Sequence, residues 1–200
     1  MTTIVDYGMG NIASVANMIR HVGGRSTTSG DPDTIARADQ LIVPGVGHFG
    51  AGMAALKRTG LDDAIRQAAD QGATILGICL GMQLLLDGSE EADAAGLGLV
   101  PGQARRFLPN GKLRVPHMGW ATVQPVRASR LFDPDDREQR FYFVHSYFAQ
   151  CTEAGDVAAT TDYGHAFVSA YERGNLMGVQ FHPEKSHRFG MALFKRLLSE

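Results

Sequence analysis

The chain has 200 residues, of which 44% are hydrophobic and 20% charged, with a formal net charge of −2 and a pI of about 6.4. This length predicts one globular domain over residues 1–200, with a core large enough to need neither disulfides nor a structural metal. The charge balance excludes a basic footprint for nucleic acid or an anionic membrane, and we expect a cytoplasmic protein because no leader peptide or apolar run of ~18 residues is recognisable.

The first half of the chain alternates short apolar runs with amphipathic stretches. Strands are predicted at residues 4–5, 41–43 and 73–78, the second of them ended by Pro44-Gly45. Helices are predicted at residues 12–22, 49–57, 61–71 and 80–86. Strands separated by helices indicate βαβ units and a parallel sheet.

The second half favours strands. Residues 141–148 are rich in aromatic and β-branched side chains, and residues 167–171 and 177–181 predict two strands joined by a turn at Gly174-Asn175. Ser186 is a candidate N-cap for a last helix over residues 187–198. The predicted fold class is therefore α/β, a single flavodoxin-like domain with a central mixed, mostly parallel sheet flanked by helices.

A candidate nucleophile lies where a predicted strand runs into a predicted helix. Residues 77–81 read Gly-Ile-Cys-Leu-Gly, the thiol counterpart of the G-x-S-x-G elbow. Such a turn exposes the Cys79 sulfur at the carboxyl edge of the sheet and offers the Leu80 N–H as an oxyanion donor. The alternative is a buried structural cysteine between packing glycines; Cys151, without such glycines, is interpreted that way.

A candidate base follows another strand. Pro183 disfavours the helical region for His182, so His182 and Glu184 should project from the same side of an extended segment. A carboxylate next to an imidazole can orient it as a general base for a thiol. No histidine spacing indicates a metal site.

Two glycine loops follow predicted strands. Residues 8–13 fit G-x-G-x-x-A, the dinucleotide fingerprint, but the preceding Asp6-Tyr7 would crowd a pyrophosphate, which favours a tight turn instead. Residues 44–47, Pro-Gly-Val-Gly, can aim a backbone N–H at a reacting carbonyl and so form the second half of an oxyanion hole.

Taken together, these segments resemble the glutaminase subunits of imidazole glycerol phosphate synthase, which are class I (triad-type) glutamine amidotransferases. The resemblance runs nearly end to end and rests on residues 6–11, 44–47, 77–83, 116–120 (Pro-His-Met-Gly-Trp), 145–147 (His-Ser-Tyr) and 180–186 (Gln-Phe-His-Pro-Glu-Lys-Ser). The position after Gly119-Trp120 departs from the family pattern, because Ala121 stands where asparagine is expected.

The resemblance implies a role for each matching residue. Cys79 attacks the side-chain amide of L-glutamine, His182 moves the proton, and Glu184 orients His182. The remaining implied roles are an oxyanion hole from backbone of Gly45, Val46, Gly47 and Leu80, glutamine contacts from Gln83, Ser146 and Tyr147, and partner-facing positions at Met118, Trp120 and Lys185. No cofactor is implied.

The implied partner is a cyclase with a (β/α)8 barrel, bound as a heterodimer. The ammonia would pass into it and help form imidazole glycerol phosphate and aminoimidazole carboxamide ribotide in histidine biosynthesis. Two alternatives stay open, a paralogous glutaminase that feeds another synthase, such as one amidating a sugar, and a non-catalytic docking subunit. A low basal rate without the partner is also expected, because the loop at residues 44–47 can reorient.

Overall fold

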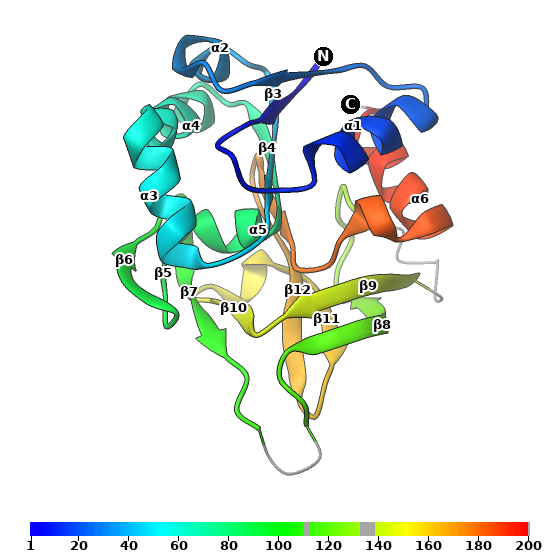
Figure 1. The fold of residues 1–200 in the computed structure, drawn as a ribbon. Coiled ribbons are helices and arrows are strands. Elements are labelled where there is room, and N and C mark those ends of the chain that lie inside the picture. Colours follow the sequence, from blue (N-terminus) through cyan, green and yellow to red (C-terminus); the bar gives the residue numbers. More distant parts are fainter. Residues whose placement is uncertain (110–112, 133–138, 200) are drawn as a thin grey trace.

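The computed structural model describes residues 1–109, 113–132 and 139–199 and alternates strands with helices in its first half (Figure 1). The helices are α1 (Ile12–His21), α2 (Pro32–Ala36), α3 (Phe49–Thr59), α4 (Leu61–Asp70), α5 (Leu80–Leu84) and α6 (His187–Leu197), with single 3-10 turns η1 (Ala154–Asp156) and η2 (Pro183–Lys185). The strands are β1 (Thr2–Val5), β2 (Ser26–Ser29), β3 (Gln40–Gly45), β4 (Thr74–Cys79), β5 (Leu86–Ser89), β6 (Ala92–Ala95), β7 (Val100–Arg106), β8 (His117–Pro125), β9 (Gln139–His145), β10 (Tyr147–Cys151), β11 (Val157–Asp162), β12 (Ala166–Arg173) and β13 (Leu176–Val179).

One mixed sheet organises these strands. Its parallel part has the order β2-β1-β3-β4-β13. From β13 the sheet continues through antiparallel pairs to β12, β10 and β7, and β11 leads from β12 to the β8–β9 hairpin. The predicted α/β fold with a central mixed sheet is therefore confirmed, but the sheet is not mostly parallel as predicted. The parallel order is confined to the part that carries the predicted nucleophile and to the β5–β7 pair, because most strands of the second half of the chain pair antiparallel.

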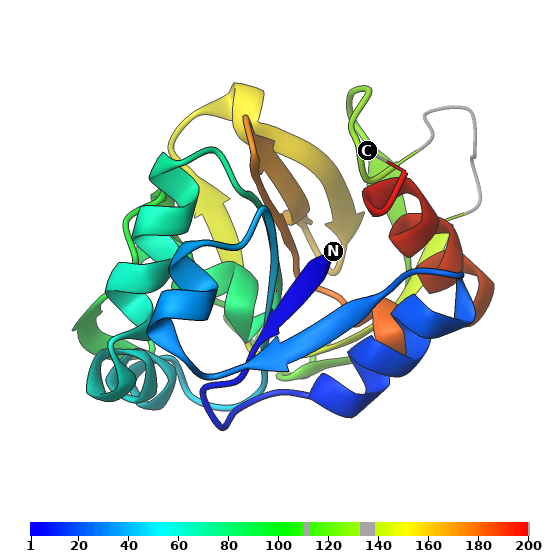
Figure 2. The ribbon, with the colours of Figure 1, turned by 90° about the horizontal axis from the view of Figure 1, so that it is seen from above.

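Helices cover both faces of the parallel strands. Figures 1 and 2 show α1 and α6 on one side and α3 and α4 on the other. Because side chains alternate along a strand, Ile42 packs into the cluster under α1 and α6, and its neighbours Leu41 and Val43 pack into the cluster under α3 and α4. Strands covered on both sides must be apolar throughout, which is why residues 41–43 are all hydrophobic.

Among the differences from the predicted boundaries, three concern the ends of β3, α5 and β9. Strand β3 does not end before Pro44; it continues to Gly45, because β1 pairs with β3 only as far as Ile42 and no partner there needs the missing N–H. The predicted helix at residues 80–86 is shortened to α5, since Leu86 begins β5. The predicted strand at residues 141–148 is two strands, interrupted at Ser146.

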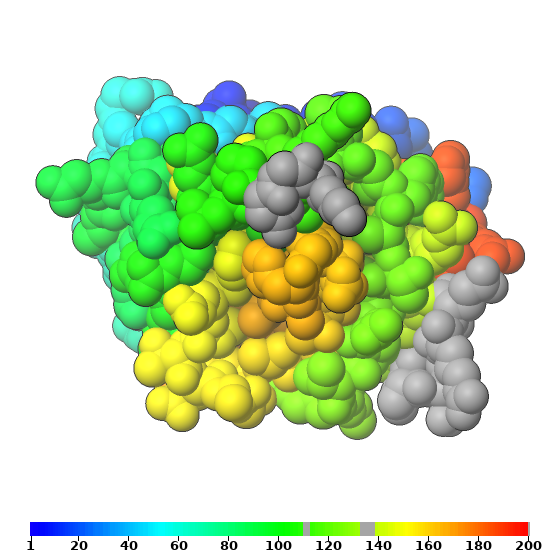
Figure 3. All heavy atoms as spheres, turned by 90° about the horizontal axis from the view of Figure 1, so that it is seen from below, coloured from blue at the N-terminus to red at the C-terminus, as the bar shows by residue number. Residues whose placement is uncertain are grey.

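The antiparallel strands form a second layer of structure beyond the carboxyl ends of β1, β3 and β4 (Figure 1). The space-filling view of that end of the molecule shows a surface made largely by the segments from β7 to β12 (Figure 3). The loops that leave β3, β4 and β13 therefore lie at the edge of the parallel strands that faces this layer. Among the residues described, no helix is long and apolar enough to cross a membrane.

Candidate active site

Cys79 lies at a strained corner between β4 and α5. Its backbone angles are φ 55° and ψ −109°, a combination that a residue with a side chain rarely adopts. Strain of this kind costs about 1–3 kcal/mol and is typical of functional sites. The predicted elbow is thus present as a sharp strand-to-helix turn.

Glycines make this corner possible. A Cβ atom added at Gly81 would lie 1.8 Å from the carbonyl oxygen of Val43, and one at Gly77 would lie 2.7 Å from the Gly81 carbonyl. Neither distance allows a side chain. At Gly45, opposite Cys79 on β3, a Cβ would lie 2.6 Å from the Tyr7 hydroxyl. The α5 turn therefore lies directly against β3, and only glycine permits that approach.

His182 and Glu184 form a buried pair after β13. The His182 Nδ1 and Glu184 Oε1 atoms are 2.8 Å apart, and each side chain is only 1% exposed. Pro183 between them starts η2 and keeps His182 extended, with φ −103° and ψ 93°. Because Nδ1 faces the carboxylate, Nε2 is the free ring atom, and among the described residues it has no hydrogen-bond partner.

The electrostatics of the pair favour a proton on His182. Burial alone lowers the pKa of this imidazole, but the Cys79 sulfur and the Glu184 carboxylate outweigh burial and raise the pKa to about 10. A charged imidazolium is thus stabilised between the Cys79 sulfur and the Glu184 carboxylate. Such an imidazole can accept a thiol proton readily and keep it until a leaving group needs it.

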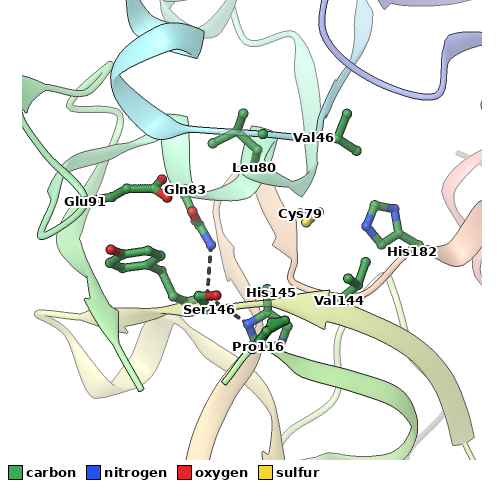
Figure 4. Close-up of a pocket in the computed structure, with 12 residues that line it drawn as sticks. Val46, Cys79, Leu80, Gln83, Glu91, Pro116, Val144, His145, Ser146 and His182 are labelled. Carbon is green, nitrogen blue, oxygen red and sulfur yellow. Dashed lines mark hydrogen bonds between the residues drawn. The ribbon is translucent and has the colours of Figure 1, made fainter. Parts of the chain in front are cut away.

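Cys79 and His182 face one another across a pocket of about 320 Å³ (Figure 4). Its volume is at the small end for ligand sites, which suits a molecule the size of an amino acid. The other lining residues are Val46, Gly47, Leu80, Gln83, Glu91, Pro116, Val144, His145, Ser146 and Tyr147. The pocket therefore combines the predicted nucleophile and base with the predicted glutamine contacts.

The amide of Gln83 is fixed at one end of the pocket. Its Nε2 donates to the Tyr147 carbonyl and to Gln180 Oε1, both at 3.0 Å. Gln180 Nε2 in turn lies 3.8 Å from the Cys79 sulfur. Because both Gln83 amide protons are used, its Oε1 remains as an acceptor for a ligand.

The Tyr147 carbonyl is also bonded by His145, a buried histidine that is itself bonded by His117. His145 Nδ1 lies 2.8 Å from the Tyr147 oxygen and must donate its proton to that acceptor. His145 Nε2 then accepts from His117 Nδ1, 3.2 Å away. Burial lowers the pKa of His145 to about 3 and that of His117 to about 4, so both rings are neutral. The hydrogen bonds from His117 to His145 and from His145 to the Tyr147 carbonyl thus fix the backbone at Ser146 and Tyr147.

The predicted oxyanion residues separate into two groups. Leu80 and Val46 line the pocket beside Cys79 (Figure 4). Gly47 also lines this pocket. Gly45 does not line it, because this residue is buried in β3 and pairs with Cys79. Gly47 has φ 108°, which glycine adopts easily, and Val46 is 38% exposed at the pocket.

The predicted partner-facing residues are all on the surface. Met118 and Trp120 on β8 are 62% and 41% exposed, and Lys185 in η2 is also exposed. The Trp120 ring stacks on His187, with centroids 5.7 Å apart and an interplanar angle of 5°. Ala121 packs toward the core, so the departure from the family pattern lies on the other side of β8 from Met118 and Trp120.

Three residues that contact the site were not predicted as site residues from the sequence. Glu91 enters the pocket from the β5–β6 turn, with Oε2 accepting from the Phe49 N–H at 2.7 Å. Gln180 connects Gln83 to Cys79. Ser186 donates to the His182 carbonyl at 2.6 Å and accepts from the Tyr142 N–H at 3.0 Å. Gln180 and Ser186 lie in the quoted Gln-Phe-His-Pro-Glu-Lys-Ser motif, but no sequence signal singles out Glu91.

Comparisons with known proteins agree with this geometry. The family model described as glutamine amidotransferase class-I matches residues 3–199. The imidazole glycerol phosphate synthase subunit HisH of Symbiobacterium thermophilum is 50% identical over 95% of this chain and 89% of its own, and the subunit HisH 2 of Methanococcus maripaludis is 44% identical over the full length of both. A solved structure of PurLQS from Thermotoga maritima covers 99% of this chain and 97% of its own at 20% identity and a TM-score of 0.77, a likeness of fold alone.

Proposed function

This chain belongs to the class-I glutamine amidotransferase family, and we propose that it is a glutaminase subunit of imidazole glycerol phosphate synthase that hydrolyses L-glutamine to glutamate and ammonia. The observation that carries the proposal is the meeting of a strained cysteine elbow and a buried His182–Glu184 pair in one small pocket. Full-length relatives named HisH support the same assignment.

In the first half of the reaction, the Cys79 sulfur attacks the side-chain amide carbon of glutamine. The thiol proton moves to His182 Nε2, which has no hydrogen-bond partner among the residues that the structure describes, and Glu184 holds the Nδ1–H. The carbonyl π electrons move onto oxygen and form a tetrahedral intermediate. When this intermediate collapses, the C–N bond breaks, and His182 returns its proton to the leaving nitrogen, so that ammonia and a glutamyl thioester result.

In the second half, water attacks the thioester. His182 takes a proton from that water, a second tetrahedral intermediate forms, and its collapse breaks the C–S bond and releases glutamate. The thiolate then recovers a proton from His182, which returns the site to its starting state. No external oxidant, metal or cofactor is needed to balance these steps.

Both intermediates carry an oxyanion, and backbone N–H groups are the donors that we assign to it. The Leu80 N–H follows the nucleophile directly, and the Val46–Gly47 segment lines the pocket on the same side. Gly45 supports these donors through its close contact with the α5 turn and does not reach the ligand itself. Donors of this kind are each worth about 10²–10³ in kcat.

Selectivity for an amino acid follows from the opposite end of the pocket. The Glu91 carboxylate and the free Gln83 Oε1 are both acceptors, and together they suit the α-ammonium group of glutamine. The Ser146–Tyr147 backbone, fixed by neutral His145, completes this end. A rigid acceptor set rejects ligands that lack a donor, because buried polar groups would be left unpaired.

We assign the ammonia to a partner cyclase with a (β/α)8 barrel, which would use it to form imidazole glycerol phosphate and aminoimidazole carboxamide ribotide. Exposed apolar side chains at Met118 and Trp120 support docking of a partner on β8, and Lys185 adds a charge nearby. A chloroplastic imidazole glycerol phosphate synthase hisHF of Arabidopsis thaliana is 42% identical over 99% of this chain but only 34% of its own length, which leaves room there for a second catalytic unit.

The test is glutamate release from glutamine by the full chain, alone and with the candidate cyclase and its ribotide ligand. We expect strong stimulation by both together, abolished by Cys79→Ala and retained in Cys151→Ala. Turnover that ignores the cyclase would assign the glutaminase to another synthase. Absence of turnover under all conditions would overturn the catalytic assignment in favour of a docking subunit.

A further inference from the structure

The loop between β1 and α1 reaches the buried carboxylate of Glu184. Glu184 Oε1 lies 3.4 Å from Asn11 Nδ2, a contact that spans 173 positions of sequence. On its other side the same oxygen contacts His182 Nδ1. The carboxylate is therefore held between a histidine and an amide donor, and its Oε2 atom has no hydrogen-bond partner among the described residues.

The position of Asn11 makes this contact unusual. Asn11 is the N-cap of α1, where an asparagine side chain normally accepts a hydrogen bond from the first turn of its own helix. Here the side chain makes no capping bond. The first turn of α1 also contains no acidic residue. The Asn11 side chain therefore does not cap α1, and its amide donates to the Glu184 carboxylate instead.

The Glu184 carboxylate also borders a second pocket. This pocket, of about 440 Å³, lies between α1 and α6 and is lined by Glu184 together with Ser14, Asn17 and His187. Without a donor on the α1 side, the Glu184 side chain could turn into that pocket and leave His182. Asn11 closes this option, because its amide holds Oε1 where His182 also needs it.

We propose that Asn11 is a positioning residue for the reaction, acting through Glu184 to keep His182 in its productive orientation. The inference rests on the proposed glutaminase function. Asn11 does not line the pocket that holds Cys79, so it acts on kcat and leaves glutamine binding unchanged. It also gives the loop at residues 8–11 a role other than the dinucleotide site weighed from its glycine pattern.

Two substitutions separate positioning from helix capping. Asn11→Ser keeps a good N-cap residue but removes the amide donor. Asn11→Asp keeps the shape, adds a favourable negative charge at a helix N-terminus, and replaces the donor with a group that repels Glu184. Both should lower kcat about tenfold or more at unchanged KM, the effect of losing a hydrogen bond to a charged group. Thermal unfolding of Asn11→Ser should stay close to that of the unmodified chain, because serine can cap α1 in place of the lost contact. Asn11→Asp should unfold at a somewhat lower temperature, because its carboxylate lies beside the buried Glu184 carboxylate.

The matched control is Asn17→Ser. Asn17 lies on α1 and lines the same second pocket, but the hydrogen bond of its side chain in the described structure is to Arg20, which donates to Asn17 Oδ1 at 2.7 Å. This variant should keep full activity. If Asn11→Ser or Asn11→Asp retains the kcat of the unmodified chain, or loses activity only in step with thermal stability, the inference is overturned.

Alkylation of Cys79 keeps this result distinct from failure of the proposed function. The rate at which iodoacetamide modifies Cys79, followed against pH, reports how well His182 supports the thiolate and requires no turnover. Asn11→Ser should shift the rise of that profile to higher pH, whereas Asn17→Ser should not. An unmodified chain that stays inactive even with the cyclase and its ribotide ligand would refute the glutaminase, but an unshifted alkylation profile in Asn11→Ser would refute only the role of Asn11.

Discussion

Replacing Gly81 with alanine tests whether the Cys79 corner depends on a missing side chain. The new Cβ would lie 1.8 Å from the Val43 carbonyl oxygen, about 1.6 Å short of the 3.4 Å at which ordinary van der Waals contact begins. Val43 cannot yield easily, because it is paired with Gly77 in the β3–β4 ladder. The start of α5 must therefore move away from β3. Gly81 itself has no left-handed φ, so the effect is purely steric.

The structural and catalytic costs of this movement differ. Overpacking in a close-packed interior costs about 1–3 kcal/mol of unfolding free energy. The same movement displaces the Leu80 N–H from the oxyanion, and a misplacement of about 1 Å can cost roughly 100-fold in rate. We therefore expect Gly81→Ala to remain folded, with a modest loss of stability and a fall in kcat of about 100-fold or more.

Gly155→Ala is the matched control, because a Cβ there meets nothing within 4 Å and its φ is ordinary. Stability would be measured by urea unfolding and activity by glutamate release, for both variants and the unmodified chain. Gly155→Ala should leave kcat unchanged and should change the free energy of unfolding by no more than about 0.5–1 kcal/mol. A Gly81→Ala variant with unchanged stability and kcat would refute the close approach of α5 to β3.

Further predictions concern the titrating groups. Iodoacetamide should modify Cys79 and leave Cys151 unmodified at neutral pH in the folded protein, because burial raises the pKa of Cys151 to about 12. Peptide mass mapping that finds both cysteines labelled equally would contradict this. The free energy of unfolding should fall as pH drops from 6.5 toward 4, because His145 becomes protonated in the unfolded chain but, with a pKa of about 3, stays neutral in the folded chain. His145→Gln should reduce this pH dependence by up to ~1.4 kcal/mol per pH unit, as measured by urea unfolding at a series of pH values. His182 acts in the opposite direction, because its pKa of about 10 in the folded state makes stability fall as pH rises above 6.5. Glu184→Gln should weaken that alkaline loss and lower kcat at least about 100-fold, and an unchanged alkaline arm would show that the carboxylate does not support the imidazolium.

Much of the fold was predictable because its parallel strands are covered on both sides. Apolar runs at residues 41–43 and 73–78 and the amphipathic stretches around them identify β3, β4, α1, α3 and α4. By contrast, β2 reads Ser-Thr-Thr-Ser, and β6 reads Ala-Asp-Ala-Ala. Their polar or small side chains give no strand pattern, and pairing with a neighbour decides their structure.

The candidate site was predictable where local backbone chemistry determines it. Glycines around Cys79 and the proline after His182 constrain φ and ψ, and those constraints can be recognised in the sequence. Glu91 could not be found in this way. It reaches the pocket only because β5 and β6 fold back beside α3, where the Phe49 N–H holds its carboxylate. A contact of this kind depends on long-range packing and leaves no local pattern.

The two helix N-caps show why a correctly predicted element can still hide its function. Asn11 and Ser186 are residue types that favour helix starts, and α1 and α6 do begin directly after them. Yet neither side chain makes a capping bond. Ser186 bonds the backbone of His182 and Tyr142, and Asn11 bonds the Glu184 carboxylate. The uncapped N–H groups cost each helix some stability, about 1 kcal/mol for a typical cap. Both losses occur beside the His182–Glu184 pair, because the two side chains bond the Glu184 carboxylate and the His182 backbone instead of their own helices.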